Sequence, residues 1–387
     1  MEFRDLKRQY QVLKADLDKA MLDIAASGGY IMGGAVTELE EQLAEYVGVK
    51  HCMTCANGTD ALTLALKTLG IGKGDAVYVP DFTFFASAEV VAAEGATPVF
   101  VDVDPQTFNI DTTSLREAIH NVEKEGRLKQ KAIIAVDLFG LPADFASIKS
   151  IAAHHGLYVI EDGAQGFGGC IGNKRACSFG DIGTTSFFPA KPLGCYGDGG
   201  AVFTNNDEWA DLIRSLRVHG KGSCKYDNIR IGLNSRLDTI QAAILKVKFE
   251  AFKKNELALV NIVAEHYTKQ INDNINKDYA IKAETPHIPE GFLSSWAQYT
   301  IRLNTLTSSN GISREELQSR LKASGIPTMV YYPTPMSRQT AFKGLHPYVN
   351  TTNAAHLSQC VLSLPMHPYM TDTEIQTVIE TLAEHLK

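Results

Sequence analysis

The chain has 387 residues, of which 44% are hydrophobic and 21% charged, and this ordinary globular composition excludes a disordered or fibrous protein. A chain of this length usually exceeds what one hydrophobic core can organise, so we expect two domains. The formal net charge of -7 excludes a general attraction to nucleic acid or to an anionic membrane. Any anionic ligand must therefore be met by a local cluster of basic side chains.

The N-terminus is charged from its first residues, and no uninterrupted apolar run approaches the length of a membrane-spanning helix. We therefore expect a soluble, cytoplasmic protein. The seven cysteines are scattered and odd in number, which predicts reduced thiols rather than a disulfide framework. Cys52 and Cys55 have the spacing of half a zinc or redox motif, but no second pair completes it, so no metal site is predicted.

Two helices are expected first, with an apolar, glycine-bounded loop between them. Apolar residues recur at helical spacing through residues 5–27, and the pattern stops at Ser27-Gly28-Gly29. The second helix is expected from about Thr37, because Thr37 and Glu40 have the spacing of a capping box. The loop between the helices contains Met32.

A third helix is expected to begin at Asn57-Gly58-Thr59 and to end at Leu69. Gly58 and Thr59 leave backbone N–H groups accessible at the helix N-terminus, together with a hydroxyl group, which suits a phosphate dianion. Taken alone, these residues are better explained by an ordinary helix cap.

From Asp75 onward, short apolar runs alternate with helical patterns. The runs are nearly continuous, as in strands buried on both faces, and cover residues 76–80, 97–102, 132–137 and 157–162. Helical patterns separate them at residues 84–94, 112–125 and 144–155. This alternation predicts a parallel sheet with helices on both faces, in which ligands bind outside the carboxyl ends of the strands.

Two strand ends carry candidate chemistry. Asp162 ends the fourth run, and Lys191 follows a further expected strand at residues 182–188. A lysine amine in such a place can form an imine when its surroundings disfavour the ammonium form, although most lysines in turns are ordinary surface residues. Neither a Rossmann G-x-G-x-x-G motif nor a Walker motif occurs. We expect Asp162, Ser186 and Lys191 to share one pocket, with Gly58-Thr59 above it.

A local basic cluster appears in residues 214–236, where the only acid is Asp227. Its basic members are Arg214, Arg217, Lys221, Lys225, Arg230 and Arg236. Three glycines in this stretch favour a mobile binding loop, and a solvated surface loop is the open alternative.

After Asp238 a long helix leads away from the predicted sheet. We expect a large domain over residues 1–250, with a further strand at 201–205, and a small α+β domain over residues 251–387. The elements expected in the small domain are strands at 298–303 and 328–332 and helices at 313–324 and 372–385.

The candidate parts fit one cofactor. A lysine amine, an acid at a strand end, a phosphate cradle and an aromatic turn at residues 81–85 are what pyridoxal phosphate requires. The lysine would carry the cofactor as an imine, and the carboxylate would pair with the protonated pyridine nitrogen. A charge-assisted hydrogen bond of this kind is worth roughly 1.5 to 3 kcal/mol.

Over essentially its whole length the chain resembles the DegT/StrS-type family of pyridoxal-phosphate-dependent sugar aminotransferases. The matching stretches are residues 57–62, 161–165, 186–191, 197–200 and 234–238. The resemblance implies the fold-type I architecture and a homodimer whose active sites lie at the interface. It also implies that Lys191 holds the cofactor and moves the protons, and it excludes the dehydratase branch, in which histidine replaces the lysine.

The resemblance assigns further site residues. Asp162 would pair with the pyridine nitrogen, Gln165 would touch the ring or its hydroxyl, and Phe84 would stack on the ring. The residues implied for the phosphate are Gly58, Thr59, Ser186 and, from the other subunit, Asn234. Those implied for the substrate are Met32, His219, Arg236 and Tyr331.

Residues 191–196 and 363–369 carry a closer resemblance within the family. It implies transfer of an amino group from L-glutamate to carbon 3 of a UDP-linked 2-acetamido-3-oxo-uronate, for O-antigen or lipopolysaccharide synthesis. Arg236 could meet the uronate carboxylate, whereas Tyr331 stands where histidine is commoner and supplies no positive charge. The open alternatives are a substrate without the carboxylate, such as UDP-3-oxo-GlcNAc or a dTDP-6-deoxy sugar, amination at carbon 4, and a non-catalytic regulator with the same fold.

Overall fold

The computed structural model describes residues 1–224, 226–277, 283–304 and 312–386. A seven-stranded sheet forms its centre, with the strand order β1-β9-β8-β5-β4-β2-β3. β9 runs antiparallel to both of its neighbours, and the other pairs are parallel. The strands are β1 His51–Cys55, β2 Asp75–Pro80, β3 Thr97–Val101, β4 Lys129–Val136, β5 Tyr158–Asp162, β8 Ile182–Ser186 and β9 Gly200–Thr204.

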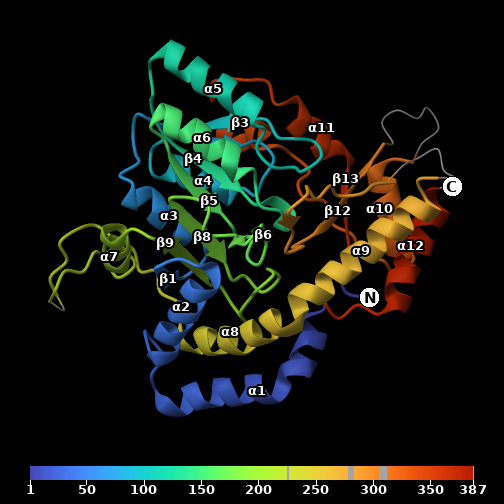
Figure 1. Cartoon of the computed structure of the whole chain (residues 1–387), viewed down its shortest axis with the longest axis horizontal. Helices are drawn as coiled ribbons and strands as arrows, with labels where there is room; N and C mark the ends of the chain where they lie inside the picture. The colour runs from blue at the N-terminus through green and yellow to red at the C-terminus, as the bar shows by residue number, and fades with distance from the viewer. Residues whose placement is uncertain (225, 278–282, 305–311, 387) are drawn as a thin grey trace.

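Helices cover both faces of this sheet (Figure 1). Val77 and Val79 of β2 point into a core shared with α3 Gly58–Thr68, α4 Ala86–Ala93 and α7 Asp207–Leu216. Ala76 and Tyr78, on the opposite face of the same strand, pack with α5 Thr112–Glu125 and α6 Phe145–His155. Both faces of β2 are buried, which explains its continuous apolar sequence.

Three helices lie beside the β1 edge of the sheet: α1 Leu6–Ser27, α2 Gly34–Val47 and α8 Thr239–Ala251. α1 runs along α8, away from the sheet (Figure 1). Asp5 caps α1 by accepting a 2.8 Å hydrogen bond from the Arg8 amide, and Gly28 ends the helix in the left-handed region.

The C-terminal part has its own core around the sheet β10-β12-β13. These strands are Ala283–Glu284, Tyr299–Leu303 and Val361–Leu364, and α9 Leu257–Asn274, α10 Arg314–Ala323 and α12 Asp372–Leu386 pack around them. α11 Thr352–Cys360 instead contributes Ala354 and Leu357 to the core of the large sheet. The predicted domain division after residue 250 falls at the end of α8 and stays a prediction.

Short elements complete the described chain. A π-helical turn, Phe252–Glu256, joins α8 to α9. A small sheet pairs β6 Cys170–Ile171 with β7 Lys174–Arg175 and with β11 Phe292–Leu293. The 3-10 turns are Leu138–Gly140, Met336–Arg338 and Thr340–Phe342.

The predicted alternation of parallel strands and helices is confirmed, and three local predictions are wrong. α2 begins at Gly34, not near Thr37, because the Glu40 carboxylate is taken by tertiary partners instead of closing a capping box. Residues 51–55, read only as a cysteine motif, form strand β1. The strand expected at 328–332 is reduced to one bridge between Met329 and Ser363.

In the described ranges, none of the helices combines the length and the apolar character that crossing a bilayer requires. The seven cysteines are all free thiols, and burial raises the pKa of Cys52 and Cys55. Raised thiol pKa values make these two side chains ordinary apolar packing groups of the core.

Candidate active site

Four segments with predicted site residues follow strands whose carboxyl ends lie at one edge of the large sheet. β1, β2, β5 and β8 run in the same direction, since β9 is antiparallel to both β1 and β8. Gly58 follows β1, Phe84 follows β2, Asp162 ends β5 and Ser186 ends β8. The sheet topology therefore brings these residues to the same edge.

The start of α3 lies against the end of β8. A Cβ atom added to Gly58 would stand 2.7 Å from the Ser186 Cβ and 3.2 Å from its Oγ, so only glycine fits there. Asn57 caps the helix by accepting a 2.7 Å hydrogen bond from the Asp60 amide. The first N–H groups of a helix have no intrahelical acceptor, so the Gly58-Thr59 backbone beside the Ser186 hydroxyl has the geometry of a cradle suited to an anion.

Asp162 is buried and held by two hydrogen bonds. The Ser87 Oγ donates to its Oδ2 at 2.8 Å, and the Ala164 amide donates to its Oδ1 at 3.2 Å. Burial raises the pKa of Asp162, while these donors and the positive charge of Lys191 oppose that rise. A carboxylate with these donors is prepared to pair with a cationic ring nitrogen.

Lys191 occupies a hydrogen-bonded turn just past β8. Its amide donates to the Phe188 carbonyl at 2.9 Å, and the Cys195 amide donates to the Phe187 carbonyl at 2.8 Å. Burial lowers the pKa of the Lys191 amine to about 8, Asp162 acts in the opposite direction, and Arg4 adds to the lowering. About a tenth of the amine is therefore uncharged at pH 7, far more than for an ordinary lysine, and this is the form that attacks a carbonyl or accepts a proton.

Gln165 is fixed in place by other protein groups. Its Oε1 accepts from the Phe139 amide at 2.7 Å, and its Nε2 donates to the Tyr332 hydroxyl at 2.9 Å. The Tyr332 ring lies 6.2 Å from the Phe84 ring, centroid to centroid. Phe84 itself is 54% exposed, so one of its faces is available for stacking.

The residues predicted to contact substrate are not joined to this cluster by hydrogen bonds or ion pairs in the described part of the chain. His219 and Asn234 lie together at the base of one loop, where the His219 amide donates to the Leu233 carbonyl at 2.8 Å. Met32 is 40% exposed, and its neighbour Ile31 bridges to Asp238, just before α8. Tyr331 packs against Phe3, with ring centroids 6.2 Å apart.

In the predicted basic cluster, some side chains form ion pairs within the protein, and others line an open hollow. Arg217 is buried and forms a 2.5 Å ion pair with Glu40, and Arg214 pairs with Asp211 at 3.0 Å. Lys225 lies outside the described residues. The open hollow of about 780 Å³ in this loop is lined by Lys221 and Arg230, among others.

The profile of the DegT/DnrJ/EryC1/StrS aminotransferase family matches residues 11–383. The chain belongs to this family. It is 44% identical over 382 residues to the UDP-2-acetamido-2-deoxy-3-oxo-D-glucuronate aminotransferase of Pseudomonas aeruginosa, and the match covers 99% of each chain.

Solved structures of aminotransferases have the same fold as this chain. A DegT DnrJ EryC1 StrS aminotransferase from Brucella abortus has a TM-score of 0.93 and 46% identity over 100% of both chains. NtdA from Bacillus subtilis, solved with bound cofactor PMP, has a TM-score of 0.83 and 28% identity, covering 97% of this chain and 82% of its own. This aminotransferase therefore has the fold-type I architecture, and its cofactor is pyridoxal 5'-phosphate.

The residues at the sheet edge fit this cofactor. The cradle at Gly58 suits its phosphate, buried Asp162 suits its ring nitrogen, and the weakly basic Lys191 suits its carbonyl. Two further residues contact this cluster, and the sequence did not point to either: Ser87 bonds to Asp162, and Tyr332 bonds to Gln165. Ser87 is separated from Asp162 by 75 positions, and no spacing rule reports such a contact.

Proposed function

We propose that this aminotransferase moves an amino group from L-glutamate to carbon 3 of UDP-2-acetamido-2-deoxy-3-oxo-glucuronate. The observation that carries the reaction class is the weakly basic Lys191 amine beside the buried Asp162 carboxylate at the sheet edge. The choice of sugar is supported by the Pseudomonas relative, whose name specifies this ketone and whose sequence matches along the full chain.

The proposed roles follow from the contacts. Pyridoxal phosphate supplies an electron sink that stabilises negative charge at the carbon that loses a proton. Asp162, held ionised by Ser87 and Ala164, keeps the ring nitrogen of the cofactor protonated. The Lys191 Nζ takes the proton from the glutamate Cα and later delivers a proton to carbon 3 of the sugar.

We also propose how the remaining residues bind. Gly58, Thr59 and Ser186 would hold the phosphate, with Asn234 of a second copy completing the cradle in a homodimer. Gln165 and Phe84 would position the ring from its edge and its face. The residues proposed for the two anionic substrates are Met32, His219, Arg236 and Tyr331. A cytoplasmic location, where nucleotide sugars are made, accords with this role.

The test is a substrate comparison. We expect the purified protein, given pyridoxal phosphate and glutamate, to aminate the 3-oxo-uronate and to leave 4-oxo nucleotide sugars unchanged, as mass spectrometry of the products would show. Lys191→Ala should abolish product formation, whereas Lys149→Ala, on an exposed part of α6, should leave it unchanged. Amination of 4-oxo sugars alone would overturn the assignment to carbon 3, and full activity of Lys191→Ala would overturn the mechanism.

A further inference from the structure

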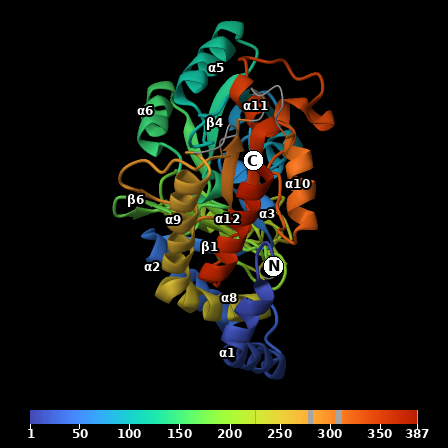
Figure 2. The same cartoon turned by 90° about the vertical axis from the view of Figure 1, so that its right-hand side faces the viewer.

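The residues that precede and begin α1 form an N-terminal strap, residues 3–8, which is bound to the C-terminal part at both ends and reaches the Lys191 turn in between. In Figures 1 and 2 the N-terminus lies beside α12. The Phe3 carbonyl accepts a 3.0 Å hydrogen bond from the Met366 amide, and the Phe3 ring packs on Tyr331. One end of the strap is thereby fixed to the C-terminal part.

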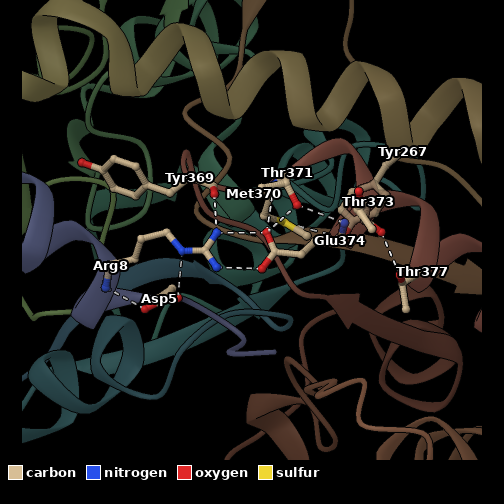
Figure 3. Close-up of polar contacts among 9 residues, drawn as sticks. All are labelled: Asp5, Arg8, Tyr267, Tyr369, Met370, Thr371, Thr373, Glu374 and Thr377. Atoms are coloured by element: carbon tan, nitrogen blue, oxygen red, sulfur yellow. Dashed lines mark hydrogen bonds and ion pairs between the residues drawn. The ribbon is translucent and has the colours of Figure 1, made fainter.

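The other end of the strap is fixed by Arg8 (Figure 3). Its guanidinium donates to both carboxylate oxygens of Glu374, at 2.7 and 2.9 Å, and to the Tyr369 carbonyl at 2.6 Å. Its Nε also lies 3.3 Å from the Asp5 carboxylate. A bidentate pair of this kind holds a defined geometry, so the residues between Phe3 and Arg8 are fixed from both sides.

Arg4 extends from this fixed strap to the backbone of the Lys191 turn. Its Nη2 donates to the Lys191 carbonyl at 3.0 Å and lies 3.5 Å from the Pro192 carbonyl. Its Nη1 is buried and has no hydrogen-bond partner among the described residues. The guanidinium is therefore committed to the turn that presents the amine.

The charge of Arg4 is only partly balanced. Burial lowers the pKa of Arg4 to about 10, so it stays cationic at neutral pH, and the carboxylate that faces it belongs to Glu256. Glu256 in turn accepts hydrogen bonds from Gln9 and from the Tyr369 hydroxyl. Lys248, buried on α8, places a second basic group nearby, and burial keeps the pKa of His367 low, at about 4, so that this histidine is neutral.

We propose that Arg4 is a positioning residue for the transamination: its guanidinium holds the Lys191 turn, and its charge favours the uncharged Lys191 amine. The proposal rests on the proposed function, in which Lys191 carries the cofactor. Two charged groups influence the pKa of this amine in opposite directions: Asp162 from β5 raises it, and Arg4, bound to the Lys191 carbonyl, lowers it. A second cation close to a lysine disfavours its protonation, and a fixed backbone limits where its amine can go.

The experiment titrates the protonation of the Lys191 nitrogen through the absorbance of the bound cofactor as a function of pH. Arg4→Gln keeps a donor but removes the charge, and we expect it to raise the titration midpoint by about 0.5 to 1.5 pH units. Arg4→Lys keeps the charge and should restore the wild-type midpoint. Lys7→Gln is the matched control, because this cation of the same strap is exposed and pairs only with Glu2 in the described part of the chain.

A second measurement separates the proposal from simple loss of folding. The full chain stripped of cofactor is labelled with acetic anhydride across a range of pH, and mass spectrometry follows the peptide that contains Lys191. The same upward shift of the midpoint in Arg4→Gln supports the proposal. An unchanged midpoint in both experiments, whatever happens to the melting temperature, overturns it. Absence of any lysine-bound cofactor absorbance in the wild-type protein would instead overturn the proposed function.

Discussion

Two fully buried carboxyl groups lie next to Asp162: Glu161 precedes it in β5, and the Asp137 amide donates to its backbone carbonyl at 3.1 Å. Burial raises the pKa of Glu161, and hydrogen bonds from the backbone amides of Cys177, Phe179 and Gly180 to its carboxylate oppose that rise. Burial and the neighbouring Glu161 charge raise the pKa of Asp137 well above its usual range. We infer that the pair holds one proton, and that this proton resides on Asp137.

Replacing Asp137 tests this inference. The folded pair keeps a proton that the unfolded chain releases above about pH 4, so stability falls as pH rises, by up to about 1.4 kcal/mol per pH unit. Asp137→Asn supplies an uncharged side chain of the same shape and should remove this slope. Unfolding by denaturant at several values between about pH 5 and pH 8 measures it.

Asp16→Asn, on the exposed face of α1, is the control and should retain the wild-type slope. If Asp137→Asn and the wild-type protein showed the same pH dependence of stability, the shared proton would be refuted.

The shared proton also has a consequence for the cofactor. Because the Asp137–Glu161 pair then carries a single negative charge, Asp162 can remain ionised beside it.

At the scale of elements, α1 and α12 are joined by the Arg8–Glu374 pair, although they lie at opposite ends of the chain. The Arg8 hydrogen bond is the main cause that lowers the pKa of Glu374 to about 2. An acid with a lowered pKa stabilises the fold above its ordinary pKa of 4.5, and that contribution is lost as pH falls toward 2.

A double-mutant cycle tests the link between the two helices. Because Arg8 is partly exposed, we expect Arg8→Ala and Glu374→Gln to reveal a coupling of about 1 kcal/mol, well below the value a buried pair would give. The coupling should disappear below about pH 2, where Glu374 is neutral. The exposed pair Lys19–Asp23 is the comparison, with a smaller coupling expected. If all variants of the Arg8 cycle had the same free energy of unfolding, the Arg8–Glu374 pair would contribute nothing to stability.

The elements that the sequence predicted are those with an unambiguous local pattern. β2 from Ala76 onward and β4 from Ala132 onward are continuous apolar runs, and α5 has a regular apolar stripe. β1 was missed because its cysteines and Thr54 do not alternate with polar residues, and its strand character comes from pairing with β9. The capping box failed because Glu40 finds stronger partners in Thr54 and Arg217, which are distant in sequence.

At the scale of the whole molecule, two apolar segments remain exposed in the single chain. Ile229 and Ile231 are 56% and 90% exposed, and Tyr30 and Ile31 are 54% and 52% exposed. Large apolar side chains gathered near a candidate site often mark an interface between subunits. The proposed homodimer would cover them and bring Asn234 to the phosphate cradle of the other copy.

Complementation tests this shared site. Lys191→Ala and Asn234→Ala chains are each expected to be nearly inactive as homodimers. Random mixing after dissociation should restore about a quarter of wild-type activity, because half of the dimers are mixed and each of those has one intact site. Activity assays before and after mixing measure this. No recovery, with mixed dimers verified by mass spectrometry, would place both residues in the same subunit's site.

The candidate site was predictable where its residues follow strand ends. Asp162 and Lys191 could be chosen because parallel strands present their carboxyl ends at one edge. Ser87 and Arg4 were not predictable, since each acts on a residue reached only through the tertiary fold, across 75 and 187 positions respectively. Local patterns contain no information about contacts at such separations.

The N-terminal strap also sets the order in which a newly made chain can complete its active site. Phe3, Arg4 and Arg8 are synthesised several hundred residues before Met366 and Glu374, which fix the strap. At about 5 to 20 residues per second, tens of seconds of synthesis separate the two. A nascent chain that already contains the Lys191 turn therefore lacks the partners that fix the strap, and Arg4 can be held against this turn only after Met366 and Glu374 have been made.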